Sequence, residues 1–273
     1  MTTGLGSEAA KIQPEILRRI GASQAAAHTR NRIVYVVVWG LLAIGFIGAM
    51  VLAGDVDPTF FIESGPVIVL QGAGITIFVC VVSIVLATLL AIFGALGRLS
   101  TNSAINAVAG FYVSLIRGTP LLVQIFFIYF ALPQAGIILD AIPAGIIALS
   151  LNYGAYMTEI FRAGIQAVPR GQAEAAQALG MPERLLFRRI VLPQAVRIVT
   201  PAIANDFIAM LKDSALISTI GVRETLFLGQ RIGRTAFEPI AALLIVALVY
   251  WGLTILFSYF QEKLERRMAR GDR

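Results

Sequence analysis

Long apolar stretches recur along this sequence, and they restrict the chain to a helical fold inside a lipid bilayer. A helix needs about 20 apolar residues to cross the roughly 30 Å hydrocarbon core of a membrane. Six stretches meet this length, at residues 33–53, 67–96, 104–132, 143–165, 196–220 and 240–260. The composition agrees, because 58% of the residues are hydrophobic and only 14% are charged, unlike the mix of a water-soluble domain. We therefore expect an all-α integral membrane protein with about six transmembrane helices.

The basic residues between these stretches indicate the orientation of the chain, because short cytoplasmic loops are enriched in Lys and Arg. Alternate segments carry 16 basic residues on one side of the membrane and three on the other. The three are Arg223, Arg231 and Arg234, all in the last outer loop. Both termini are therefore expected in the cytoplasm. The net charge of +6 suits contact with anionic lipid headgroups rather than with nucleic acid.

The expected organisation is one membrane domain with two cytoplasmic tails. Residues 1–32 form a cytoplasmic N-terminal segment and residues 33–53 an N-terminal transmembrane helix. A core follows over residues 67–260, with a short cytoplasmic helix at 172–180. Residues 261–273 form a basic tail along the inner leaflet.

Several kinds of active site are disfavoured by the residues available. The single cysteine, Cys80, lies in the middle of an apolar stretch, and the single histidine, His28, lies in the polar N-terminal segment. A histidine-based metal centre or a nucleophile–histidine pair would need a histidine near the membrane core. No phosphate-binding loop of the G-x-x-x-x-G-K-[ST] type is present either. We therefore expect that this chain is not an enzyme: it neither hydrolyses ATP nor catalyses a reaction inside the membrane. We also expect it to bind no metal ion and no cofactor.

A charged, helix-prone segment, EAAQALGMPERLLFRRIVLPQA, interrupts the apolar sequence on the cytoplasmic side. Its first part favours a short helix that Gly180 ends at the C-terminal cap. Pro182 suits the first turn of a second helix, and Pro193 is predicted to end that helix. A helix of about eight residues is not stable alone. The first of the two short helices is therefore expected to dock on another surface, and its small alanine side chains would permit close approach.

This segment resembles the EAA motif of ABC importer permeases in Glu174-Ala175-Ala176, Gly180, Ile190, Leu192 and Pro193. Further stretches resemble the branch that carries polar amino acids and opines. They are GAGIT from Gly72, IRGTPLLVQ from Ile116, YFALP from Tyr129, GAYMTEIFRAG from Gly154 and KDSAL from Lys212. The chain departs from that branch at Ala215, where a hydroxyl residue is usual, and in its additional N-terminal helix.

The resemblance implies a type I ABC importer permease in a bacterial cytoplasmic (inner) membrane, acting on glutamate, glutamine, arginine or histidine. It implies that the segment is a coupling helix that contacts a separate ATP-binding subunit, where ATP is bound. The contacting residues would be Glu174, Ala175, Ala176, Leu179 and Gly180. The other implied partners are an extracytoplasmic amino-acid-binding protein and a second permease, either a copy of this chain or a homologue.

Ionisable side chains inside the apolar stretches point to a substrate pathway, since each costs roughly 2.5–3.5 kcal/mol at the centre of a membrane helix. Gly118-Thr119-Pro120 should break its helix, and broken helices in membranes line cavities or are buried in protein. The candidate pathway residues are Arg117, Thr119, Asn152, Glu159, Lys212 and Asp213. Mixed charges of this kind suit a zwitterion.

The same residues allow two other interpretations. The charges could form structural ion pairs, with Glu159 and Arg162 paired on one helix face and Asn152 hydrogen-bonded between helices. Alternatively, Glu159 and Asp213 could couple ions or protons in a secondary transporter or channel.

Overall fold

The computed structural model describes residues 31, 33–49, 51–52 and 57–269, in two separate units, Met1–Val56 and Asp57–Arg273. In the first unit the apolar residues Ile33–Ala49 form a helix, as expected for the start of the first stretch. The predicted cytoplasmic segment lies outside the described residues, apart from Asn31, as do Ala53 and the last four residues of the basic tail.

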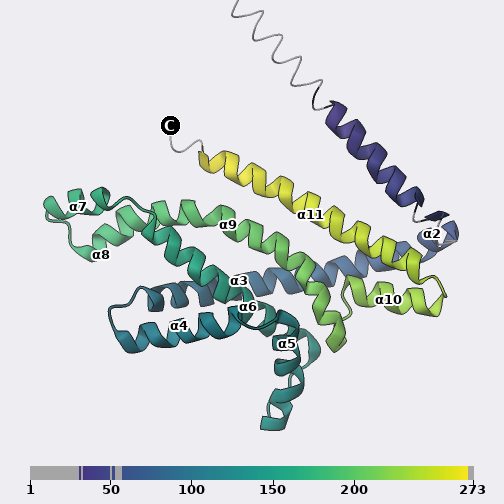
Figure 1. Ribbon diagram of the computed structural model, residues 1–273, viewed down its shortest axis with the longest axis horizontal. Helices are drawn as coiled ribbons and strands as arrows, with labels where there is room; N and C mark the ends of the chain where they lie inside the picture. The colour runs from purple at the N-terminus through teal and green to yellow at the C-terminus, as the bar shows by residue number, and fades with distance from the viewer. Residues whose placement is uncertain (1–30, 32, 50, 53–56, 270–273) are drawn as a thin grey trace, which may run out of the picture. The chain divides into compact units, whose positions relative to one another are not determined.

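The second unit is helical along its described length, with no strand among the residues that the structure describes (Figure 1). In chain order its elements are α2 (Pro58–Val67), η1 (Ile68–Gly72), α3 (Ala73–Arg98), α4 (Ser103–Arg117), α5 (Leu121–Phe126), η2 (Phe127–Ala131), η3 (Leu132–Ala135), α6 (Ala141–Gln166), α7 (Arg170–Ala178), α8 (Glu183–Leu186), η4 (Phe187–Val191), α9 (Leu192–Asp213), η5 (Ser214–Ile220), α10 (Thr225–Thr235) and α11 (Pro239–Ala269). In Figure 1, α7 and α8 lie at one end of this unit and α2 and α10 at the other.

Two helices of the described chain are long and apolar enough to cross a membrane by themselves. They are Pro58–Arg98, which runs through α2, η1 and α3 over 41 residues, and Pro239–Met268 in α11. Ser103–Arg117 and Leu121–Ala135 make a third span if they are counted together, although they are bent by 105°. The helices α6 and α9, with 26 and 22 residues, are long enough to span but carry more polar side chains.

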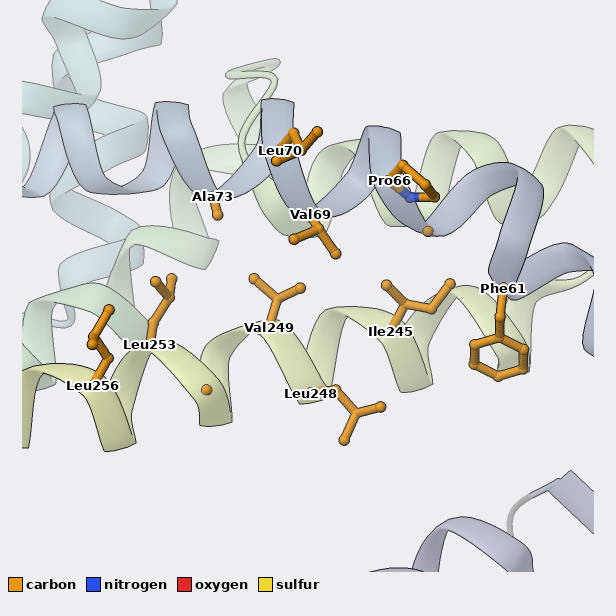
Figure 2. Close-up of a pocket in the computed structure, with 12 residues that line it drawn as sticks. Phe61, Pro66, Val69, Leu70, Ala73, Ile245, Leu248, Val249, Leu253 and Leu256 are labelled. Atoms are coloured by element: carbon orange, nitrogen blue, oxygen red, sulfur yellow. The ribbon is translucent and has the colours of Figure 1, made fainter.

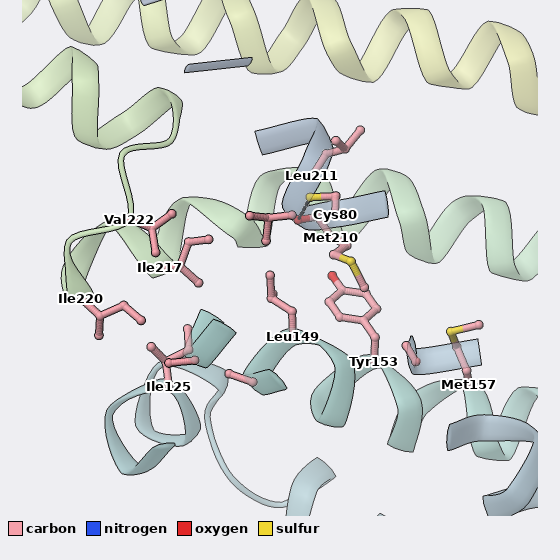
Figure 3. Close-up of a cluster of buried hydrophobic side chains, with 14 of the residues drawn as sticks. Cys80, Ile125, Leu149, Tyr153, Met157, Met210, Leu211, Ile217, Ile220 and Val222 are labelled. Atoms are coloured by element: carbon pink, nitrogen blue, oxygen red, sulfur yellow. Dashed lines mark hydrogen bonds between the residues drawn. The ribbon is translucent and has the colours of Figure 1, made fainter. Parts of the chain in front are cut away.

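The core lies where α3, α6 and α9 meet. Small residues on α3, Ala87, Ala91 and Ala95, are buried, which lets the α6 backbone approach closely. Figure 3 shows Cys80, Leu149, Met157 and Met210 pointing into one apolar cluster. Cys80 is fully buried and donates a weak hydrogen bond to the carbonyl oxygen of Met210 at 3.6 Å.

The structure corrects the predicted end of the second cytoplasmic helix. Pro193 does not end it, because the chain stays helical from Glu183 through η4 into α9. The turn Phe187–Val191 is π-helical, and the Gln194 side chain donates to the carbonyl oxygen of Ile190 at 3.0 Å. A π-helical adjustment and a side-chain donor rearrange the backbone hydrogen bonds around a proline, which keeps the helix continuous.

An apolar groove of about 740 Å³ separates the α2–η1–α3 helix from α11 (Figure 2). Only Phe, Gly, Pro, Val, Leu, Ala and Ile line it. The described residues that line it offer no charged or hydrogen-bonding side chain.

Candidate functional site

The short helix α7 ends as the sequence predicts. Gly180 has a φ of +76°, in the left-handed region that favours glycine. Met181 donates its backbone N–H to the carbonyl oxygen of Ala176 at 3.0 Å, and Gly180 donates to Gln177 at 2.9 Å. These bonds satisfy the last carbonyls of the helix and turn the chain sharply into α8.

One face of α7 is not covered by the other described residues of the second unit. Glu174, Ala175 and Gly180 are exposed, and Leu179 is 86% exposed. A leucine this exposed at a helix end is typical of a surface that another protein covers. Ala176 differs from the other candidate coupling residues, because it is only 3% exposed and packs within this chain.

The helix break at Gly118-Thr119-Pro120 is confirmed, and its backbone is satisfied by side chains. Pro120 cannot donate to the carbonyl oxygen of Ile116, four residues earlier. The Gln124 side-chain amide donates to that oxygen at 2.7 Å and also to the carbonyl oxygen of Thr119 at 3.0 Å. The Thr119 hydroxyl donates to the carbonyl oxygen of Leu115 at 2.9 Å. The helix break is therefore stabilised by specific side-chain hydrogen bonds.

Asn152 holds this break against α6. Its side-chain amide donates to the Gln124 Oε1 atom at 3.1 Å, and both side chains are buried. A cavity of about 290 Å³ lies beside the break, lined by Leu115, Ile116, Thr119, Val123, Gln124, Phe127, Ile128 and Leu151. Asn152 thus makes a hydrogen bond between helices, which was one of the two interpretations of this residue, and its partner Gln124 lines the cavity.

Arg117, the last residue of α4, is exposed and has an aromatic partner. Its guanidinium carbon lies 5.1 Å from the ring centroid of Tyr156 on α6, within the range of a cation–π interaction. It forms no ion pair with any carboxylate of the described residues. Among the described residues its guanidinium therefore contacts an aromatic ring rather than an acidic side chain.

Lys212 and Asp213 end α9, and both are exposed. The Tyr153 hydroxyl of α6 donates to Asp213 Oδ2 at 2.7 Å. About two turns earlier on the same helix, Asp206 has a buried carboxylate oxygen with no hydrogen-bond partner among the described residues. Sequence reasoning missed Asp206, although a carboxylate in an apolar stretch was a sufficient signal.

Glu159 is engaged in a charged network in the C-terminal part of α6. It pairs with Arg162 at 2.7 Å, as predicted, and also with Arg98 at the end of α3 at 3.2 Å. Arg98 exchanges hydrogen bonds with Asn106 of α4, and Arg162 donates to Gln166. The network joins α3, α4 and α6 just before the chain enters α7.

The predicted site residues thus lie in several separate groups in the structure. Thr119 and Asn152 meet at Gln124, Asp213 meets Tyr153, and Glu159 is tied to Arg98 and Arg162. Gln124 and Tyr153 were missed, because their role depends on contacts with other helices. Among the described residues no group of three or more His, Cys, Asp or Glu side chains could hold a metal ion.

Comparisons with known proteins agree on membrane components of transport systems. Residues 84–270 match the family described as "Binding-protein-dependent transport system inner membrane component". The chain is 37% identical to the arginine transport system permease protein ArtQ of Bacillus subtilis (strain 168), over 75% of this chain and 94% of that protein. It is 41% identical to the L-cystine transport system permease protein TcyB of the same organism, over 71% of this chain and 84% of that protein.

A solved structure agrees in fold. The crystal structure of an amino acid ABC transporter with histidines contains a chain that is 38% identical, with a TM-score of 0.74. The likeness covers 78% of this chain and 99% of that chain.

Proposed function

Because this chain belongs to the family of binding-protein-dependent transport system inner membrane components and is a permease subunit of an ABC importer, we propose that it carries polar amino acids into a bacterial cell. The substrates are of the class of glutamate, glutamine, arginine and histidine, and the membrane is the bacterial cytoplasmic (inner) membrane. Two relatives are named as permeases of arginine and L-cystine transport systems, which supports this substrate class.

The observation that carries the proposal is the exposed surface of α7. This nine-residue helix packs mainly on α8 and η4, and it leaves Glu174, Ala175 and Leu179 uncovered. A helix this short is not stable without further contacts. We assign these contacts to a groove on a separate ATP-binding subunit, which binds and hydrolyses ATP, while this chain binds no cofactor.

Coupling follows from the connections of α7. Its N-terminal end continues from α6, and its C-terminal end continues through α8 and η4 into α9. Both helices pack against α3 in the core. When ATP closes the two ATP-binding subunits, a displacement of α7 moves α6 and α9 as rigid bodies. The pathway between two permease copies, or this chain and a homologous permease, then changes its opening.

The substrate pathway contains the groups that a zwitterion needs. Arg117 offers a cation to a carboxylate, and Asp213 offers an anion to an ammonium group. Further hydrogen-bonding groups come from Thr119 in the helix break, Asn152 on α6 and Lys212 on α9. Glu159 belongs to the pathway only at its cytoplasmic end, since it already has two cationic partners.

The proposal is tested by purifying the tagged chain in mild detergent and identifying its stoichiometric partners by mass. The complex is then placed in liposomes with the extracytoplasmic binding protein, and uptake of labelled glutamate, glutamine, arginine and histidine is measured with and without ATP. ATP-dependent uptake of at least one of them is expected. A chain that purifies alone and transports with an ion gradient but no ATP would establish the secondary-transporter interpretation instead.

A further inference from the structure

The helix α10 is fixed to the rest of the second unit by buried polar contacts at its N-terminus. The fully buried carboxylate of Glu224 caps the helix, accepting from the backbone N–H groups of Leu226 at 2.9 Å and Phe227 at 2.8 Å. The Tyr250 hydroxyl of α11 also donates to this carboxylate. The hydroxyls of Thr225 and Thr76 of α3 are 2.9 Å apart. The start of α10 is thereby joined to both α3 and α11.

Close packing fixes the remainder of α10. A Cβ atom added to Gly229 would lie 2.2 Å from Val246 Cγ2, and one added to Gly233 would lie 2.6 Å from Ala242 Cβ, both on α11. One face of α10 is therefore pressed against α11 along its length. The helix cannot change its position without moving α11, so its opposite face is a rigid surface.

That opposite face carries exposed, unpaired positive charge. Arg231 and Arg234 lie three residues apart on α10, and both are exposed, as is Arg223 just before the helix. None of them forms an ion pair with any of the described residues. These three arginines are the basic residues of the outer loops, where the positive-inside rule disfavours Lys and Arg. Arg231 and Arg234 lie on this anchored helix and Arg223 lies just before it, an arrangement that favours a binding role.

A strained and exposed aromatic residue follows on the same corner. Phe237 has a φ of +59° and is 90% exposed. It occupies the left-handed position after α10, where Glu238 donates to the carbonyl oxygen of Gly233 at 2.8 Å, and where glycine is the favoured residue. A bulky side chain in this conformation is an outlier that marks functional sites. No packing within the described chain accounts for the phenyl ring.

We propose that Arg231, Arg234 and Phe237 form the docking surface for an acidic patch on the extracytoplasmic substrate-binding protein. Arginine and aromatic residues dominate the binding energy of protein interfaces, and a rigid surface loses little entropy when a partner binds. The positive charge attracts an acidic partner over a distance. This assignment rests on the proposed function, which supplies the binding protein and the outward orientation of α10.

The test measures the Kd between the importer complex in nanodiscs and the binding protein whose addition supports ATP-driven uptake. The double variant Arg231→Glu/Arg234→Glu is expected to raise the Kd by roughly tenfold or more and to flatten its dependence on salt. ATP hydrolysis in the absence of the binding protein should not change. The matched control is Lys263→Glu/Arg267→Glu, two exposed basic residues one turn apart on the inner end of α11, which should leave the Kd unchanged.

The variant Phe237→Gly distinguishes a docking role of the Phe237 side chain from a purely structural role. Glycine relieves the left-handed backbone, so a merely structural position would keep or gain stability. Docking predicts instead a Kd raised by roughly tenfold in this variant, while Phe237→Tyr retains binding.

The outcomes distinguish the two proposals. If the unmodified complex drives uptake and every variant binds equally well, the docking surface is wrong and the importer function stands. The docking surface is also wrong if the variants change only the response of the complex to anionic lipid in the nanodisc, since the surface then contacts the membrane. If the unmodified complex shows no ATP-driven uptake, the proposed function itself fails.

Discussion

The Gln124 side-chain amide donates to the carbonyl oxygen of Ile116 at 2.7 Å, taking the place of the backbone N–H that Pro120 lacks. The same amide reaches Thr119, and its oxygen accepts from Asn152. One side chain thus joins both halves of the broken helix to α6. Arg117 and Thr119, which we propose as pathway residues, lie at this junction, and Thr119 is itself hydrogen-bonded to Gln124.

Gln124→Leu removes these hydrogen bonds with little change in volume. The carbonyl oxygen of Ile116 then keeps only the longer contacts from Thr119, at 3.4 and 3.5 Å. A lost hydrogen bond costs about 0.5–1.5 kcal/mol, so we expect a lower thermal midpoint of the purified permease and reduced uptake. Gln134→Leu, at an exposed glutamine in η3, is the control and should change stability by less than about 0.5 kcal/mol. Equal midpoints for the two variants would show that the Gln124 contacts do not hold the break.

Arg117→Ala should reduce transport more than assembly. The guanidinium has one aromatic partner, Tyr156, and an exposed cation–π contact contributes only about 0.5–1 kcal/mol. Uptake per assembled complex is the measurement, with Arg117→Lys as a variant that keeps the charge. A parallel loss of uptake and of assembled complex would indicate a structural role for Arg117.

Glu159→Gln tests the two interpretations of the charged network. A structural role predicts a loss of stability of about 1–3 kcal/mol, because Arg98 and Arg162 lose their partner, with the same KM for neutral and cationic substrates. Glu262→Gln, in the exposed pair with Arg266, should cost no more than about 1 kcal/mol. A shift of KM for arginine but not for glutamine would instead identify Glu159 as a substrate-pathway residue.

Much of this fold follows from the sequence, because apolar length and helix-breaking residues act locally. The break at Gly118-Thr119-Pro120, the cap at Gly180 and the Glu159–Arg162 pair need only residues a few positions apart. These features follow from helix geometry and from glycine and proline backbone preferences. Two helix limits were predicted wrongly: the stretch expected to start at residue 67 belongs to a helix that starts at Pro58, and the one expected to end at residue 260 stays helical to Ala269, into the predicted tail.

The remainder depends on contacts between distant residues. Arg98 meets Glu159 across 61 residues, and Thr76 meets Thr225 across 149; no local pattern predicts either pair. The helix α10 was not predicted either, since its cap depends on Glu224 being buried against Tyr250. Pro193 misled the prediction, because a π-helical turn next to it removes the conflict with a continuous helix.

Glu174→Arg and Gly180→Asp should each abolish ATP-dependent uptake while the permease still inserts in the membrane. The first reverses a charge on the exposed face of α7, and the second forces an L-residue into the left-handed turn that ends it. Glu63→Arg, at an exposed acid on α2, is the matched control and should transport normally. Normal uptake by both α7 variants would count heavily against a coupling role for this helix.

The most direct test of the account is a cross-link from α7 to the ATP-binding subunit. Leu179→Cys creates an exposed thiol in a chain whose own cysteine, Cys80, is buried. A thiol-specific photo-cross-linker is attached in native membranes, and products that contain the tagged permease are isolated, so within this chain the label reports on position 179. We predict a cross-linked product that contains the ATP-binding subunit and is absent from a Gln134→Cys control in η3. A Leu179→Cys permease that supports uptake yet yields no such product would contradict the claim that α7 couples this chain to ATP.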